Sequence, residues 1–183
     1  PFGHPWAVLF SWATAGKPRC IVRRTGGVLL KHLTEQVLHC DIRPGDRVFY
    51  FTTAGWMMWN WLASVLAADA TLVLYDGAPT WPDHNRVFNL ADEVGVTLLG
   101  TSAKFLDACA HAGIRPIDTH DLSSVRTLTS TGSTLNPEGF EFVYDAIKTD
   151  VHLVSMSGAT DLCGCLGSGN PLASVHGREI RTR

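Results

Sequence analysis

The residues with the clearest chemical potential lie at positions 11–19, directly after an apolar run at 6–10. This loop combines hydroxyls, small side chains and one glycine, and it ends in two cations, Lys17 and Arg19, on either side of a proline. Backbone N–H groups in such a loop approach a phosphate closely, and the cations neutralise its charge. The loop predicts a phosphate cradle, although the bulk of Trp12 leaves a plain strand-to-strand turn as the alternative.

Other nucleotide, hydrolase and metal motifs are excluded by their spacing. Gly16-Lys17 is followed by Pro18, so the hydroxyl that holds Mg²⁺ in a P-loop is missing. The sequence has no Gly-x-Ser-x-Gly elbow, and its eight histidines form no His-x-x-x-His pair. Cys163 and Cys165 are too close for a metal hairpin, and we interpret the five cysteines as free thiols in a reducing cytosol.

The composition is that of a globular α/β protein with a sizeable core. Hydrophobic residues make up 45% of the 183 positions, while charged residues make up only 17%, which indicates faces that expect cover. The net charge of −2 argues against nucleic acid or an anionic membrane as a partner. No run of 18 apolar residues predicts a membrane span, and no signal-peptide pattern follows Pro1, so we expect a cytoplasmic protein.

Strand and helix signals alternate along the chain. The strands are expected at 20–22, 47–51, 71–75, 96–99, 125–130 and 151–154, and the helices at 26–38, 56–67, 83–94, 101–112 and 136–147. This alternation predicts a doubly wound, mostly parallel sheet. Polar or glycine-bearing loops follow the strands at 11–19, 52–55, 130–134 and 155–161, and we expect these loops to meet at one edge of the sheet.

Two of the predicted helices carry informative side chains. In the helix at 26–38, the expected apolar stripe consists of Val28, Leu29, Leu33, Val37 and Leu38. The helix at 56–67 begins with a cluster of tryptophans and methionines, which is either a pocket wall or ordinary core.

Several stretches together resemble the adenylate-forming enzymes of the acyl-CoA synthetase superfamily, and within it the acetoacetate–CoA ligase family. The resemblance covers nearly the whole chain. Its most specific part is the series Asp-Ile-Arg-Pro-Gly-Asp-Arg at 41–47, followed by Phe-Tyr-Phe-Thr-Thr at 49–53 and Gly-Trp-Met-Met-Trp-Asn-Trp-Leu at 55–62. The other matching stretches are at 4–5, 11–22, 26–27, 71–77, 130–133, 157–161 and 169–171.

The resemblance implies the large N-terminal domain of such an enzyme, and a reaction in two steps. ATP and a short acid, here acetoacetate, would give an acyl-adenylate and pyrophosphate, and coenzyme A would then displace AMP to form a thioester. The first step develops charge on phosphates that are already negative, so positioning, Mg²⁺ and N–H or O–H donors matter more than a protein nucleophile.

The resemblance also assigns roles to residues. Ser11, Thr14, Gly16 and Arg19 would belong to the triphosphate loop, and Gly132, Ser133 and Thr134 would line the adenine side. Thr160 would hydrogen-bond the α-phosphate, and Asp161 would hold Mg²⁺. Trp56 and Trp59 would form one wall of the acid pocket. Gly158 would stand where acetate-specific relatives have a tryptophan, leaving room for a longer acid.

This sequence departs from the family pattern mainly in the phosphate loop, where Trp12, Ala13, Ala15 and Arg19 replace four characteristic residues. The family's N-terminal segment and its C-terminal domain with the catalytic lysine are expected to lie outside residues 1–183, so we expect no complete thioester formation by this chain alone. A non-catalytic remnant that at most binds nucleotide remains the alternative function, and an unrelated doubly wound protein is a third.

Overall fold

The computed structural model describes residues 1–11, 17–177 and 179–180, and its centre is a five-stranded parallel sheet. The strands lie in the order β4-β3-β5-β6-β7, so the chain reverses its direction of travel across the sheet between β3 and β5. Their bounds are β3 Arg47–Tyr50, β4 Thr71–Val73, β5 Leu98–Ser102, β6 Thr127–Thr131 and β7 His152–Ser155. This arrangement confirms the predicted doubly wound α/β fold.

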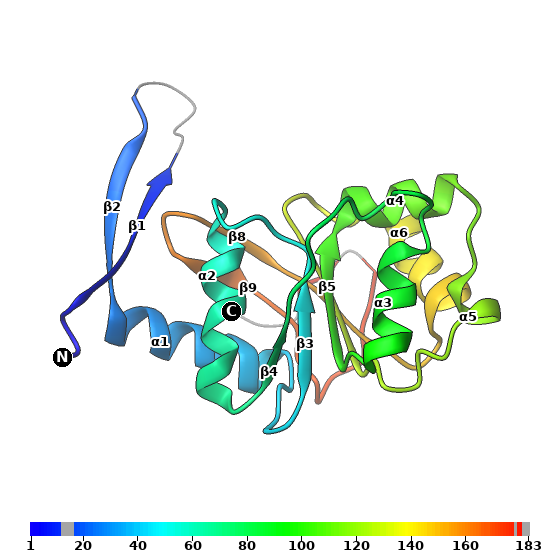
Figure 1. Ribbon diagram of the computed structural model, residues 1–183, viewed down its shortest axis with the longest axis horizontal. Helices are drawn as coiled ribbons and strands as arrows, with labels where there is room; N and C mark the ends of the chain where they lie inside the picture. The colour runs from blue at the N-terminus through cyan, green and yellow to red at the C-terminus, as the bar shows by residue number, and fades with distance from the viewer. Residues whose placement is uncertain (12–16, 178, 181–183) are drawn as a thin grey trace.

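Helices cover both faces of the sheet (Figure 1). Successive side chains of each strand point to opposite faces of the sheet. Phe49 and Leu99 therefore enter one core, while Val48 and Leu98 enter the other. The first core is covered by α3 Arg86–Val94, α4 Ala103–His111, α6 Pro137–Phe142 and η3 Val143–Ile147. The second face carries α1 Thr25–Leu33, η1 Thr34–His39, α2 Met57–Ala63 and η2 Ser64–Ala68.

The helices α4 and α6 begin at residues whose side chains cap them. The hydroxyl of Ser102 accepts a hydrogen bond from the Phe105 N–H, at 3.2 Å, and starts α4. The Asn136 side chain accepts from the Gly139 N–H at 2.7 Å, ahead of Pro137 in the first turn of α6. Ser102 is the last residue of β5, and Asn136 follows β6 after the loop at 132–135, so the two caps fix where α4 and α6 begin after these strands.

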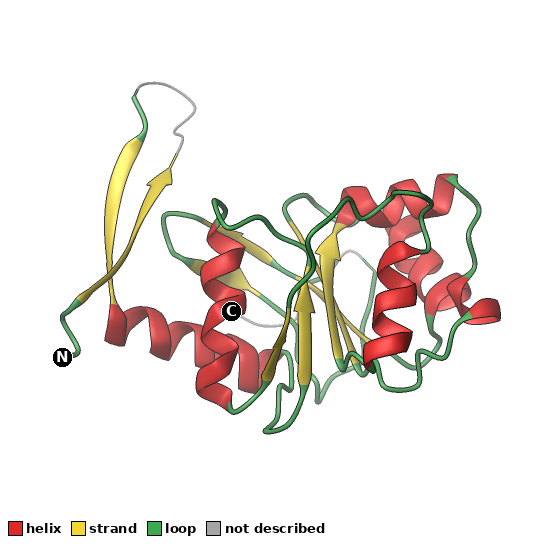
Figure 2. Cartoon of the chain, viewed as in Figure 1, coloured by secondary structure: helices red, strands yellow, loops and turns green. Residues whose placement is uncertain are grey.

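Two antiparallel hairpins lie apart from the main sheet (Figure 2). The first pairs β1 Pro5–Ser11 with β2 Arg19–Arg24, and the second pairs β8 Ser157–Ala159 with β9 Gly164–Gly167. The loop predicted at 155–161 therefore contains a strand, and that part of the prediction was wrong. Neither β9 nor the short helix α5 Pro116–Thr119 was predicted, because glycine-rich strands and single helical turns show no hydrophobic period.

The helix predicted at 26–38 is present as α1 and η1, but its buried face differs from the predicted stripe. Val28 is buried as expected, whereas Val37 and Leu38 are exposed. The buried positions are instead occupied by polar side chains: His32, Glu35 and Gln36. Among the described residues, no helix is both long and apolar enough to cross a membrane.

Candidate functional site

Segments that follow β3, β6 and β7 meet the end of β1 around one cavity of about 360 Å³, here named the Trp56 cavity. It is lined by Leu9, Phe10, Gly55, Trp56, Met57, Met58, Thr131, Gly132, Gly158, Ala159, Thr160, Gly164 and Cys165. One wall comes from the start of α2, and the facing wall comes from the β8–β9 hairpin. The predicted convergence is thus confirmed for the loops at 52–55, 130–134 and 155–161. Of the described residues in the loop at 11–19, Ser11 contacts this region through Asp161, and none lines the cavity.

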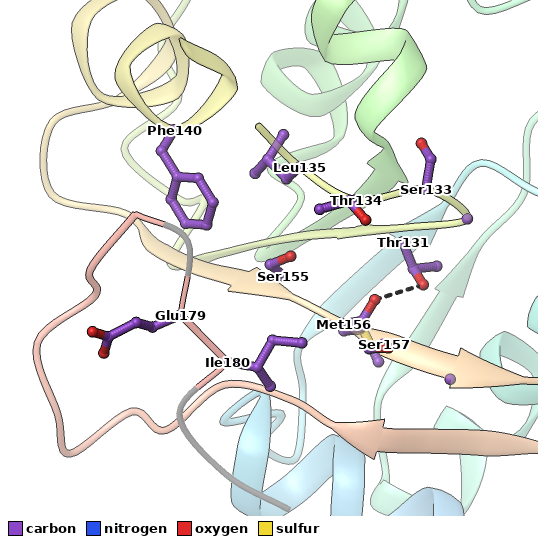
Figure 3. Close-up of a pocket in the computed structure, with 12 residues that line it drawn as sticks. Thr131, Ser133, Thr134, Leu135, Phe140, Ser155, Met156, Ser157, Glu179 and Ile180 are labelled. Carbon is purple, nitrogen blue, oxygen red and sulfur yellow. Dashed lines mark hydrogen bonds between the residues drawn. The ribbon is translucent and has the colours of Figure 1, made fainter. Parts of the chain in front are cut away.

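A second cavity, of about 320 Å³ and here named the Phe140 cavity, shares Thr131, Gly132 and Gly158 with the first. The residues that line only this second cavity are Ser133, Thr134, Leu135, Phe140, Ser155, Met156, Ser157, Glu179 and Ile180. Figure 3 shows Phe140 reaching down from α6 while Ile180 rises from the C-terminal segment. The Thr131 hydroxyl donates to the Met156 carbonyl at 3.0 Å and joins β6 to the strand end beside it.

The two cavities suit ligands with both apolar and polar parts. Apolar side chains and backbone form most of the walls, and hydroxyls at Thr131, Ser133 and Thr134 provide a few oriented donors and acceptors. Gly132 has a φ of +87°, and a Cβ built there would meet nothing within 4 Å. Glycine at this position allows the left-handed backbone that turns the chain out of β6 toward the shared rim.

The turn at Thr160 and Asp161 is held by side chains from the first hairpin. The Ser11 hydroxyl donates to the Asp161 carboxylate at 2.5 Å, and the Arg23 guanidinium donates to the backbone carbonyls of both turn residues. The carboxylate itself is exposed beside the Trp56 cavity. The first hairpin therefore positions the two residues that the sequence analysis assigned to the α-phosphate and to Mg²⁺.

Asp161 fits a magnesium ion held mostly by a substrate. Within the described residues, no group of three or more His, Cys, Asp or Glu side chains is arranged to hold a metal. Mg²⁺ commonly uses one or two carboxylates together with waters and substrate phosphates. A single exposed carboxylate beside a cavity matches that pattern, whereas it would not suit a resident zinc or calcium ion.

The remaining predicted residues fall into three groups. Thr14 and Gly16 lie outside the described residues. Arg19 is exposed at the start of β2, opposite Ser11, and lines neither cavity. Trp59 faces a small separate pocket between α2 and the strands β3 and β4, so the structure does not bring it to the same cavity as Trp56.

Gly158 lines both cavities, but the space beside its Cα is filled. A Cβ at this position would overlap the Gly164 carbonyl oxygen and lie 2.9 Å from the Cys165 Cα. Because these atoms belong to the backbone of β9, they cannot swing aside. Glycine is required here by the close pairing of β8 with β9, and a tryptophan could enter only if the hairpin moved.

Sequence reasoning missed Phe140, Leu135 and Ile180, which supply apolar surface to the second cavity. Phe140 was detectable in principle, since it stands one turn into a helix that starts directly after the 130–134 loop. Cys163 and Cys165 add no nucleophile, because burial raises the pKa of both thiols and keeps them protonated.

A parallel α/β sheet whose edge loops build a two-part cavity defines a protein that binds extended small molecules. The AMP-binding enzyme family matches residues 3–180, and the chain belongs to this family.

Relatives with high sequence identity indicate which members of this family the chain resembles. The acetoacetyl-coenzyme A synthetase of Rhizobium meliloti (strain 1021) is 57% identical over 181 residues, which cover 99% of this chain and 28% of that protein. The acetoacetyl-CoA synthetase of Mus musculus is 44% identical over 183 residues, covering 100% and 27%. A solved structure, acetoacetyl-CoA synthetase from Streptomyces lividans, superposes with a TM-score of 0.92 at 44% identity, covering 98% of this chain and 28% of that one. The chain thus spans under a third of the length of these relatives.

Proposed function

We propose that this chain forms the ATP- and acid-binding part of an acetoacetate–CoA ligase. In this reaction the acetoacetate carboxylate attacks the α-phosphate of ATP and expels pyrophosphate, and the thiol of CoA then attacks the acyl carbon and expels AMP. The observation that carries the proposal is the Trp56 cavity, where loops from four parts of the chain meet beside Thr160 and Asp161. The high identity to acetoacetyl-CoA synthetases along nearly the whole chain supports the choice of acid.

The nucleotide is proposed to lie across the rim that the two cavities share. Its adenine would enter the Phe140 cavity beside Gly132, Ser133 and Thr134, where Phe140 offers a flat apolar surface. Its phosphates would extend toward Thr160 and Asp161, next to the first hairpin.

The residues of the first hairpin are proposed to act on the phosphates. Ser11, Thr14 and Gly16 would offer hydroxyl and backbone donors, and Arg19 would add positive charge. A bound Mg²⁺ would neutralise phosphate charge as the pyrophosphate leaves. Asp161, oriented by Ser11, is the carboxylate placed to hold it.

The acid is proposed to lie in the Trp56 cavity. Trp56, Met57 and Met58 form an apolar wall suited to the methyl end of acetoacetate, and Thr160 stands where the carboxylate would meet the phosphate. Gly158 contributes by letting β8 approach β9 closely. Trp59 can act on this wall only through α2, because its side chain faces another pocket.

The same proposal covers cofactors and location. ATP, Mg²⁺ and CoA are the expected small-molecule partners, with no role for nucleic acid. A cytoplasmic location is favoured because Cys40, Cys109, Cys163 and Cys165 are buried free thiols, which suit a reducing compartment.

The decisive experiment is a chimera in which this chain replaces the matching residues of the Rhizobium meliloti enzyme. We expect the chimera to catalyse acetoacetate-dependent exchange between ATP and pyrophosphate, and to form acetoacetyl-CoA. A matched chimera carrying Asp161→Asn controls for assembly, and it should fold but lose most of this activity. A folded chimera that binds ATP without any exchange would instead identify the chain as a nucleotide-binding remnant.

A further inference from the structure

A polar face of α1 and η1 is buried against α2 and the β8–β9 hairpin, the two elements that carry facing walls of the Trp56 cavity, and the proposed function gives this polar face no role. His32, Glu35 and Gln36 have 0%, 1% and 0% of their surface exposed. Helix faces that enter a core are normally apolar, and a buried carboxylate or imidazole is retained only when hydrogen bonds satisfy it. We name these three residues the polar trio.

Glu35 connects the two walls of the cavity through its two carboxylate oxygens. Oε2 accepts a hydrogen bond from the Trp61 indole N–H at 2.9 Å, and Trp61 lies one turn beyond the Met57–Met58 wall on α2. Oε1 accepts from the Cys165 backbone N–H at 2.7 Å, on the facing wall formed by β9. Lys31 lies 3.0 Å from the same Oε1 and balances the charge.

His32 makes a second connection between the same two walls. Its Nε2 lies 2.7 Å from the Cys163 carbonyl oxygen, and because a carbonyl only accepts, Nε2 carries the proton. Its Nδ1 lies 2.8 Å from the hydroxyl of Ser64, the first residue of η2, which directly follows α2. Burial lowers the pKa of His32, so the ring is neutral at neutral pH and can keep both contacts.

Gln36 completes the connection on the α2 side. Its Nε2 donates to the Trp61 carbonyl at 2.7 Å and to the Ser64 hydroxyl at 3.0 Å. The trio therefore contacts the end of α2 in several places and the β8–β9 hairpin in two. All these elements lie on the same side of the sheet (Figure 1).

The helix formed by α1 and η1 packs so closely against the hairpin that no side chain larger than that of glycine fits at Gly164. A Cβ there would lie 2.5 Å from Glu35 Oε1 and 3.1 Å from the Lys31 side chain. The backbone of Cys163 just before it has a φ of +53°, which a non-glycine residue seldom adopts. This turn directs the Cys163 carbonyl to His32, and the surrounding contacts hold the strained backbone.

Hydrogen bonds have narrow length and angle preferences, so two walls bonded to the same rigid helix face are held at a set separation. Apolar packing alone would allow the walls to slide. We infer that His32 and Glu35 are positioning residues that fix the width of the Trp56 cavity and thereby set the length of acid it accepts. This inference rests on the proposed function for its substrate, but not for its mechanical part.

The mechanical part is tested by amide hydrogen exchange in the 183-residue chain. Glu35→Gln turns one acceptor into a donor facing other donors, and His32→Phe keeps a ring but removes both hydrogen bonds. We expect each to accelerate exchange in residues 157–167 by about tenfold, the factor that one lost buried hydrogen bond implies. His32→Gln can still donate to the Cys163 carbonyl and should restore nearly the original rates.

A core substitution on the opposite face, Phe88→Leu, is the matched control, and it should not accelerate exchange selectively in residues 157–167. Rates in this segment that stay unchanged in Glu35→Gln and His32→Phe would overturn the positioning role. Equal acceleration in Phe88→Leu would do the same, because it would show a general loss of stability.

The substrate part is tested in the chimera by comparing KM for acetoacetate with KM for 3-oxohexanoate. Glu35→Gln should reduce the discrimination between these acids by about tenfold, the scale of methylene selectivity in an apolar pocket, with a smaller change in kcat. Unchanged discrimination with a loosened hairpin would refute the specificity role. If the parent chimera fails to activate acetoacetate, the proposed function fails, and the exchange rates alone decide the role of the trio.

Discussion

The two faces of the central sheet are covered by helices of different chemistry. On one face, α3 and α4 bury only apolar side chains and a thiol: Val87, Phe88, Ala91, Ala103, Phe105, Leu106 and Cys109. On the other face, α1 and η1 bury Val28 together with the polar trio. We call the first the apolar face and the second the polar face, although α2 and η2 also bury Trp61, Leu62 and Val65 on the second. The polar face also carries the β8–β9 hairpin and the Trp56 cavity.

This difference shows how one fold combines a face that tolerates changes of side chain with a face that fixes the positions of its side chains. Apolar packing has no preferred direction and adapts when a side chain changes shape, at a cost in stability. Hydrogen bonds between buried groups fix orientation, and losing one partner leaves the other unpaired. The structure uses directional contacts on the face where two walls of a cavity must face each other.

The largest loss of stability is expected from Phe88→Ala on the apolar face. Phe88 is fully buried in the core under α3, so its truncation should cost about 3–5 kcal/mol in urea unfolding. While the protein stays folded, its affinity for Mg·ATP should change by less than about twofold, because Phe88 lines neither cavity. A tenfold weaker affinity would contradict the separation of the two faces.

Glu35→Leu on the polar face should cost about 2 kcal/mol, because it leaves the Trp61 and Cys165 N–H groups without an acceptor. Urea unfolding measures this loss, and exchange in residues 157–167 should accelerate as well. Lys31→Met, which removes the half-exposed cation but leaves both N–H donors on the Glu35 carboxylate, is the comparison and should cost less. Equal losses in the two variants would show that the ion pair, rather than the wall contacts, is what stabilises this face.

Gly158→Ala should destabilise the protein by about 1–2 kcal/mol, since its Cβ overlaps the backbone of β9. Gly27→Ala in α1 is the matched control. Nothing lies within 4 Å of its Cβ, and alanine there should be neutral or stabilising by up to about 1 kcal/mol. Thermal or urea unfolding of both variants checks the prediction, which fails if Gly158→Ala is as stable as the original chain.

The smallest effect is a pH dependence carried by His32. Burial lowers its pKa in the folded protein below the ordinary value of 6.5. As the pH falls, the unfolded chain therefore binds the proton before the folded protein does. The stability that the neutral ring contributes above pH 6.5 is lost progressively as the pH falls from 6.5 to the pKa of His32 in the folded protein. Glu35 and Lys31 are the charged neighbours of the ring, and they act in opposite directions.

Urea unfolding at about pH 7.5 and about pH 5.5 measures this dependence. His32→Gln removes the titrating ring, so its loss of stability between the two pH values should be smaller than that of the parent chain. His152, whose pKa burial also lowers, remains in both proteins and cancels in the comparison. An equal loss in both proteins would show that His32 does not titrate as proposed.

The sheet was predictable because strand and helix signals alternate without interruption, and parallel strands then have few possible arrangements. Caps such as Ser102 and Asn136 marked where helices begin. The β8–β9 hairpin was not predictable, since its strands read Ser-Gly-Ala and Gly-Cys-Leu-Gly and lack an apolar alternation. Tertiary contacts define it, namely those to Ser11, Arg23, His32 and Glu35 together with the pairing of its own two strands.

Residues of the candidate site could be predicted where a local motif marks them, but not where tertiary packing decides which side chains line the cavities. The family resemblance assigned Thr160, Gly132 and Trp56 to the phosphate, adenine and acid parts of a site, and the structure brings all three together at the Trp56 cavity. The apolar stripe on α1 was misassigned because helical periodicity identifies a helix face but does not identify the groups from other elements that this face contacts. Once the Trp61 and Cys165 N–H groups are on that face, a carboxylate is favoured over an apolar side chain.

The most direct test of the account is a calorimetric titration of Mg·ATP into the chain, paired with Mg²⁺-free AMP. If the two cavities form a nucleotide site with Asp161 at its phosphate end, both ligands bind to the parent chain. Asp161→Asn should then weaken Mg·ATP by about tenfold, the scale of one charge-assisted contact, and leave AMP unchanged. Absence of nucleotide binding, or equal weakening of both ligands, would contradict the assignment.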